Sequence, residues 1–180
     1  MLRTRLVTLR RVSKTMEPTR EPESYARDEG RRIHIGGDVL LVKALTGMGD
    51  GVAVLETVAA PGDPAPLDHV HRSYDEVFYV IEGQFEFRVG DRLARVGAGG
   101  VVTAPRGSAH TFKNCGDSDG RVLIVAAPGR AAQMLEDIGG MLAEPGPLPP
   151  DGLVRVYEGH DTVLVPPLQP TAGPPAANQA

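Results

Sequence analysis

The sequence contains a single cysteine, Cys115, and no tryptophan among its 180 residues. One cysteine excludes an internal disulfide framework and favours a reducing compartment, so we expect a cytoplasmic protein. No apolar run approaches the roughly 20 residues that a membrane-spanning helix needs, so no membrane partner is predicted.

Turn-forming residues are abundant, with 22 glycines and 16 prolines. This composition favours many short strands joined by turns over long helices, and the length suits one domain. The net formal charge is −4, although residues 1–14 carry five basic side chains and no acidic one. Because the remainder of the chain is acidic on balance, we expect no nucleic-acid partner.

Both ends of the chain differ from its middle. Residues 1–30 are polar and charged without sustained periodicity, which predicts a disordered basic segment. Residues 1–14 lack the apolar stretch of a secretory signal; the alternatives to a disordered N-terminus are a targeting peptide, a basic arm, or an extension upstream of a start at Met16. Residues 169–180 are rich in proline and alanine, which predicts a disordered tail.

Between residues 31 and 168, short β-rich runs recur about every 8–12 residues with turn signals between them, as is typical of a sandwich or barrel. Residues 84–89, QFEFRV, alternate strictly between apolar and polar side chains, which predicts a strand with one buried face. Residues 76–83, EVFYVIEG, are almost continuously apolar and predict a strand buried on both faces.

One helix is predicted over residues 129–142, where Ala131, Met134, Leu135 and Ile138 form an apolar stripe. We expect this stripe to pack against the outside of the barrel. Residues 153–168 predict either a short helix or a final extended segment.

Two of the five histidines, His69 and His71, are one residue apart. In a strand, side chains two apart face the same way at a backbone separation of about 6.6 Å, so both rings can converge on one metal ion. Glu76 lies at an odd offset from His71 and would face away unless the polar residues 72–75 form a turn or bulge. His110 follows a second turn at the start of a later strand. A histidine taken singly is more often a surface or satisfied core residue than a metal ligand, so the prediction depends on the residues taken together.

The spacing of these residues resembles the two motifs of the cupin family. The first motif, with four residues before the glutamate and six after it, is matched by Gly62, His69, His71, Glu76 and Gly83. The second is matched by Gly99, Pro105, Gly107, His110 and Asn114. The resemblance covers about residues 35–128, and the segment beyond it is similar to the extension of quercetin-dioxygenase-like cupins. The spacer between Gly62 and His69 is one residue longer than usual in the family.

The resemblance implies an all-β, double-stranded β-helix (jelly-roll) barrel over residues 31–168, with the C-terminal helix packed outside. It implies that His69, His71, Glu76 and His110 bind one divalent transition metal, which is Fe, Mn, Ni, Cu, Co or Zn, because this donor set does not suit Ca²⁺ or Mg²⁺. Glu76 is also expected to act in catalysis as a proton acceptor. By analogy with the family we expect a homodimer.

Several functions fit this site, since fold does not fix function. The first is an oxidoreductase, a metal-dependent dioxygenase acting on a small organic molecule such as a phenol. The alternatives are a metal-dependent isomerase, cyclase or decarboxylase, a small-ligand-binding cupin without turnover, and a barrel whose histidines bind no metal.

Other residues near the motifs have weaker claims to a role. Asp75 is the fallback carboxylate, although strand alternation puts it opposite Glu76. Tyr74 is expected on the solvated surface of the loop. The interior of the barrel is expected to include some of Tyr79, Phe87, Val89 and Phe112, and Asn114 is expected to bond near a turn.

Overall fold

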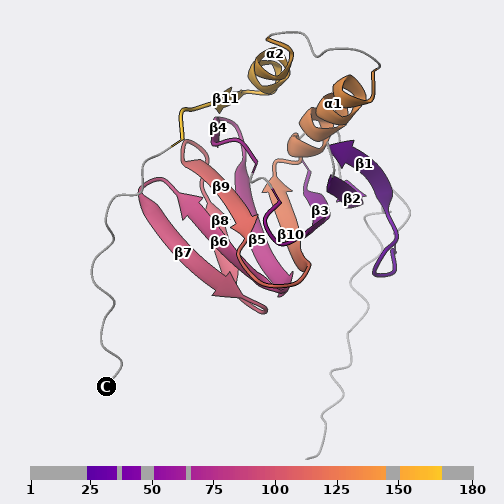
Figure 1. Cartoon of the computed structure of the whole chain (residues 1–180). Coiled ribbons are helices and arrows are strands. Elements are labelled where there is room, and N and C mark those ends of the chain that lie inside the picture. The colour runs from indigo at the N-terminus through magenta and orange to yellow at the C-terminus, as the bar shows by residue number, and fades with distance from the viewer. Residues whose placement is uncertain (1–23, 36–37, 46–50, 64–65, 145–150, 168–180) are drawn as a thin grey trace, which may run out of the picture.

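A computed structural model describes residues 24–35, 38–45, 51–63, 66–144 and 151–167. Within these residues, two antiparallel sheets face one another and two helices lie together at one end of them (Figure 1). The strand orders are β1-β2-β3-β10-β5-β8 in one sheet and β11-β4-β9-β6-β7 in the other. The two-sheet jelly-roll architecture predicted from the sequence is confirmed. The elements are β1 (Arg31–Ile35), β2 (Asp38–Leu45), β3 (Ala53–Ala59), β4 (His69–His71), β5 (Asp75–Glu82), β6 (Gln84–Val89), β7 (Arg92–Gly97), β8 (Val101–Ala104), β9 (Ala109–Asn114), β10 (Gly120–Ala127), α1 (Ala131–Ala143), α2 (Gly152–Gly159) and β11 (Thr162–Leu164).

The core lies between the inner faces of the two sheets. Strand β6 places Phe85 and Phe87 there, both almost fully buried, as its alternating sequence predicts. Phe87 meets Phe78 of β5 in the opposite sheet, with ring centroids 5.3 Å apart. Such tilted aromatic pairs contribute about 0.5–1.5 kcal/mol beyond their buried area. The aromatic cluster of Phe78, Phe85 and Phe87 therefore stabilises the packing of the two sheets against each other.

Strand β5 is buried on one face only, so the prediction of burial on both faces is wrong. Phe78 and Val80 are buried, whereas Val77 is 37% and Tyr79 is 42% exposed. Tyr79 therefore lies on the outer face rather than in the barrel interior. It pairs with Val101 and Leu123 on the neighbouring strands. Apolar side chains on the half-exposed face are stabilised by such cross-strand pairs. Because both faces of β5 therefore carry apolar residues, the sequence does not show the alternation expected of a strand with one buried face.

Helix α1 packs against the sheet at β1 through the predicted stripe, in which Ala131, Met134 and Ile138 are buried. Gly139 permits the close approach, because a Cβ there would lie 2.8 Å from Ile33 Cγ2 and 3.0 Å from the His34 carbonyl oxygen. The segment expected to be helical or extended contains both structures, α2 followed by β11. Neither helix in the described ranges is long and apolar enough to span a membrane.

The predicted disordered segments lie mostly outside the described residues, which begin at residue 24 and end at residue 167. Residues 24–30 precede β1, and the carbonyl oxygens of Ala26, Arg27 and Glu29 accept hydrogen bonds from the Lys43 ammonium group. This end of the N-terminal segment is thus attached to β2.

Gly83, in the turn between β5 and β6, gives a first prediction. Its φ is +83°, and a Cβ would lie 2.8 Å from the Gly120 Cα, so Gly83→Ala adds a backbone clash to left-handed strain. Gly90→Ala is the matched control, because Gly90 has φ +58° with nothing within 4 Å of the added Cβ. Left-handed strain alone costs about 1–2 kcal/mol, or roughly 2–8 °C in Tm for a chain of this size. Thermal unfolding should show a clearly larger fall for Gly83→Ala, and equal falls would contradict the clash.

Candidate metal centre

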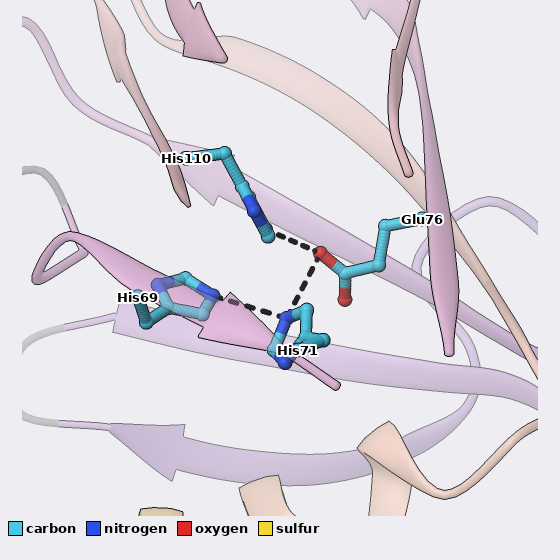
Figure 2. Close-up of side chains that lie close together, drawn as sticks. All are labelled: His69, His71, Glu76 and His110. Atoms are coloured by element: carbon cyan, nitrogen blue, oxygen red, sulfur yellow. Dashed lines mark hydrogen bonds and ion pairs between the residues drawn. The ribbon is translucent and has the colours of Figure 1, made fainter. Parts of the chain in front are cut away.

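Four buried side chains from three strands converge on one space between the sheets (Figure 2). His69 and His71 project together from β4, a strand of only three residues. His110 lies opposite His69 on the neighbouring strand β9. Glu76 comes from β5 in the other sheet. The structure thus brings together all four residues that the sequence proposed as ligands.

The ligand atoms are close enough to share one ion. Glu76 Oε2 lies 3.0 Å from His110 Nε2 and 3.4 Å from His71 Nε2. His69 Nε2 lies 3.1 Å from His71 Nε2. One ligand atom from each residue lies within 4.8 Å of those of the others. Ligand atoms bound to a common ion at about 2.0–2.2 Å stand at most roughly 4.4 Å apart, so the cluster needs only small side-chain shifts to enclose one.

The odd offset of Glu76 is resolved by a change of sheet. The chain leaves β4, turns over residues 72–74 and enters β5 on the other side of the interior, so strand alternation from His71 does not apply. Asp75, the fallback carboxylate, points away and binds Arg106, whose Nη2 lies 2.8 Å from Asp75 Oδ2. Asp75 therefore plays no part in the cluster.

Tyr74 lies inside this turn and not on the solvated surface, so the surface prediction is wrong. It is fully buried, and its ring stacks on His71 with centroids 4.0 Å apart and an interplanar angle of 26°. Its hydroxyl lies 3.9 Å from the Met134 sulfur. The ring packs against the imidazole because the turn between the two sheets directs the Tyr74 side chain inward, while Arg72 in the same turn is exposed.

Each imidazole is oriented by a hydrogen bond at Nδ1. The Nδ1 atoms of His69 and His110 lie 2.6 Å and 3.0 Å from the carbonyl oxygens of Leu67 and Ser108. Carbonyl oxygens only accept, so in both rings Nδ1 carries a proton, and Nε2 of His69 keeps its lone pair. Nε2 of His110 faces the Glu76 carboxylate, which accepts its proton until a cation displaces it. His71 Nδ1 lies 2.9 Å from Thr162 Oγ1. All three Nε2 atoms thus face the centre of the cluster.

The cluster sets the protonation of its own members. Burial, helped by the neighbouring His110 and His71, lowers the pKa of His69 to about 3. Burial also lowers the pKa of His71, against the opposing pull of Glu76. Burial alone would raise the pKa of Glu76, but the hydrogen bond from His110 and the neighbouring His71 imidazole outweigh it and hold that pKa below the usual range.

His110 is the exception among the imidazoles. Burial favours its neutral form, yet the hydrogen bond and charge of Glu76 prevail and raise the pKa of His110. At neutral pH the cluster therefore presents two neutral imidazoles, one carboxylate and one imidazole that tends to hold a proton. A cation that displaces this proton meets three nitrogen donors and one oxygen donor, a set that fits a divalent transition metal.

A cavity of about 530 Å³ extends from the four residues between the sheets. Its walls are mostly apolar, and Phe112, one of the expected interior residues, contributes to them. Phe87 lies in the core between the sheets and Val89 packs against it, and neither lines the cavity. The helices also form part of the wall, a role that the sequence did not indicate. Their contributions are Ala131, Met134, Leu135, Ile138 and Leu142 of α1, and Leu153 and Tyr157 of α2.

Asn114, the last residue of the second motif, has a structural role as expected. Its Nδ2 donates to the carbonyl oxygens of Ala59 and Ser118, both at 2.8 Å, and its Oδ1 accepts from the Gly116 amide. These bonds join the end of β9 to the end of β3 and to the turn before β10. Asn114 thus fixes the strand that carries His110.

Comparison with known proteins agrees with this architecture. Residues 55–126, which include all four clustered side chains, match the family model described as "Cupin domain". This match and the two-sheet fold agree with each other, so residues 55–126 are similar to a cupin domain.

Two solved structures share the fold. KdgF from Halomonas sp. aligns with a TM-score of 0.55 at 19% identity, covering 63% of this chain and 99% of its own. A protein with a double-stranded β-helix domain from Klebsiella pneumoniae aligns with a TM-score of 0.51 at 27% identity, covering 61% of this chain and 92% of its own. In both alignments, the matched region is a smaller share of this chain than of the solved structure.

Among curated proteins, the chain is similar to the endoribonuclease YbeY of Myxococcus xanthus, with 29% identity over 146 residues and 81% of this chain covered. The chain spans only 43% of that protein, and it spans half or less of the curated relatives that it matches. The whole relative's activity is therefore not carried over.

The shifted histidines predict an acid-sensitive fold in protein freed of metal by a chelator. Below the ordinary histidine pKa of 6.5, His69 and His71 take up protons in the unfolded chain. In the folded chain they stay neutral, because the pKa of His69 is about 3 and that of His71 is also lowered. The free energy of unfolding therefore falls as pH falls through this window. Glu76, whose folded pKa is depressed, adds a further loss below its ordinary value of 4.5.

His110 acts in the opposite direction, because its raised pKa contributes stability that is lost as pH rises through the folded value. The two lowered imidazoles outnumber it, so the Tm of metal-free protein should fall steadily between about pH 6.5 and pH 4, and His69→Gln should flatten part of that fall. A Tm that stays level down to pH 4 in the unchanged chain would contradict the burial of neutral imidazoles.

Proposed function

We propose that the chain is a metal-dependent oxygenase of the quercetin-dioxygenase-like kind, acting on a small and mainly apolar organic molecule such as a phenol. The observation that carries the proposal is the position of the four-residue cluster in the wall of a mostly apolar cavity of about 530 Å³. A cavity of this size accommodates a one- or two-ring molecule.

The chain's own residues supply binding, orientation and proton transfer. His69, His71, Glu76 and His110 would hold the metal, which when bound supplies Lewis-acid and redox chemistry at this place. The apolar side chains of Leu55, Phe78 and Ile124 exclude water from the reacting atoms. Glu76 is the carboxylate that accepts the proton of the substrate's hydroxyl group.

The overall reaction is balanced without a further cofactor. In a dioxygenation both atoms of O₂ enter the organic product, so the electrons that reduce oxygen come from the bonds of the substrate. An apolar pocket also suits O₂, which is itself apolar. The proposed partners are therefore a small phenolic molecule and O₂. Separately, we propose that the protein is a homodimer in the cytoplasm.

The test combines metal analysis with oxygen consumption. The chain is purified without chelators, its metal content is measured, and O₂ uptake is followed with a panel of phenols that includes one-ring and two-ring members. We expect uptake that depends on the metal and gives a product carrying both atoms of ¹⁸O₂. Turnover that continues without O₂ would replace the proposal with a metal-dependent isomerase, cyclase or decarboxylase. Tight binding of a phenol without turnover would replace it with a binding protein.

A further inference from the structure

The short strand that carries two of the histidines is held by the C-terminal end of the described chain. Strand β11 pairs with β4 so that Thr162 lies opposite His71 and Leu164 opposite His69. The Arg72 amide donates to the Asp161 carbonyl and the Val165 amide to the Asp68 carbonyl, each at 2.9 Å. Figure 1 shows β11 beside β4, after the chain has passed through both helices. This segment lies outside the residues that match the cupin model.

Thr162 makes the side-chain contact between this segment and the cluster. It is fully buried, and its Oγ1 lies 2.9 Å from His71 Nδ1 and 3.2 Å from the His160 carbonyl oxygen. The carbonyl can only accept, so the Thr162 hydroxyl donates to it. The hydroxyl oxygen is therefore free to accept from His71 Nδ1–H, which would leave the lone pair of His71 on Nε2 for a bound metal.

The partner of His71 differs in kind from the partners of the other two imidazoles. His69 and His110 each bond a carbonyl oxygen two residues earlier in the chain, so their local strands set their orientation. His71 instead bonds a side chain 91 residues away. The orientation of this ring thus depends on where the C-terminal segment docks, and a single substitution can test the dependence.

We propose that Thr162 is a positioning residue for the metal centre, fixing the tautomer and ring orientation of His71 from the C-terminal segment. The inference rests on the proposed metal site and not on the oxygenase reaction. A hydrogen-bond partner of a metal-binding histidine typically contributes roughly 10–100-fold to metal affinity, which gives the expected size of the effect. A threonine that merely fills the core would be replaced by isosteric valine with no effect on metal affinity.

The test uses the full chain with Zn²⁺ as the probe, in competition with a chromophoric chelator. Thr162→Val should weaken Zn²⁺ binding at least about tenfold, and Thr162→Ser, which keeps the hydroxyl, should restore most of it. Thr111→Val is the matched control, because it removes another buried threonine hydroxyl, one that donates to the Pro66 carbonyl at 2.6 Å and not to an imidazole. A loss below tenfold for Thr162→Val, or an equal loss for Thr111→Val, overturns the proposal.

A second readout does not measure affinity. In Zn²⁺-loaded protein, where Nε2 of His71 would bind the ion, ¹⁵N NMR should show a hydrogen-bonded Nδ1–H of His71 in the unchanged chain and in Thr162→Ser. Thr162→Val should shift that signal to the position of an Nδ1–H without a partner, and an unchanged signal would overturn the proposal. A chain that binds no Zn²⁺ at all ends both the metal site and this inference. A chain that binds Zn²⁺ as expected but never consumes O₂ ends only the oxygenase.

Discussion

His110→Ala should leave the purified chain with almost no bound metal, whereas the unchanged chain should carry about one ion. The substitution removes one of four donors and leaves Glu76 without its 3.0 Å partner. The loss of affinity should exceed the roughly 10–100-fold that removal of a ligand's hydrogen-bond partner costs. Metal analysis after gel filtration measures the difference directly.

The same comparison has a thermal counterpart. Free metal at about 1,000 times its Kd stabilises a folded protein by about 4.1 kcal/mol, which is roughly 8–16 °C in Tm for a chain of this size. His110→Ala should lose this increase. His34→Ala is the control, because His34 is an exposed histidine on β1 and its variant should keep both the metal and the increase. Full metal content in His110→Ala would contradict the proposed donor set.

Ala59→Phe should lower kcat/KM on a phenolic substrate by about 100-fold, equivalent to about 2.7 kcal/mol, and leave the metal in place. Ala59 lines the cavity from β3, near the Asn114 end of β9. Phenylalanine is favoured in strands, so the larger side chain enters the cavity with little cost to the backbone. The filled space then excludes the substrate.

Val58→Phe supplies the matched control for this variant. Val58 is the preceding residue of β3, and because side chains alternate, it faces the outside of the sheet. The same added volume there should leave kcat/KM within about twofold of the unchanged chain. If both variants lose activity equally, or if Ala59→Phe retains full activity, the cavity is not the substrate site.

The histidine pair was predictable because it depends on a single local rule. Side chains two apart in a strand share a face, and β4 places His69 and His71 together as that rule requires. The two motif spacings similarly placed Glu76 and His110 near them, through a resemblance and not through geometry. The rule could not predict how Glu76 reaches the cluster. Glu76 lies in the other sheet, and a change of sheet between two strands produces no periodic pattern in the sequence.

The supporting contacts were not predictable, because each depends on where distant segments dock. The sequence predicts Tyr74 to be an exposed loop residue, yet its side chain turns inward and is buried against His71. Thr162 lies in an extended segment with no motif, and its role follows only from the pairing of β11 with β4. For the same reason, the helix stripe predicted packing but not the cavity that Met134 and Ile138 help to enclose.

X-ray absorption at the metal edge of the loaded protein tests the central claim most directly. We expect three imidazole nitrogens at about 2.0–2.1 Å and one carboxylate oxygen at about 2.0–2.2 Å for Zn²⁺, with the imidazole signal falling by one ring in His71→Ala. A shell that contains sulfur, which only Cys115 or a methionine could supply, or an imidazole signal that is unchanged in His71→Ala, would contradict a centre built from His69, His71, Glu76 and His110.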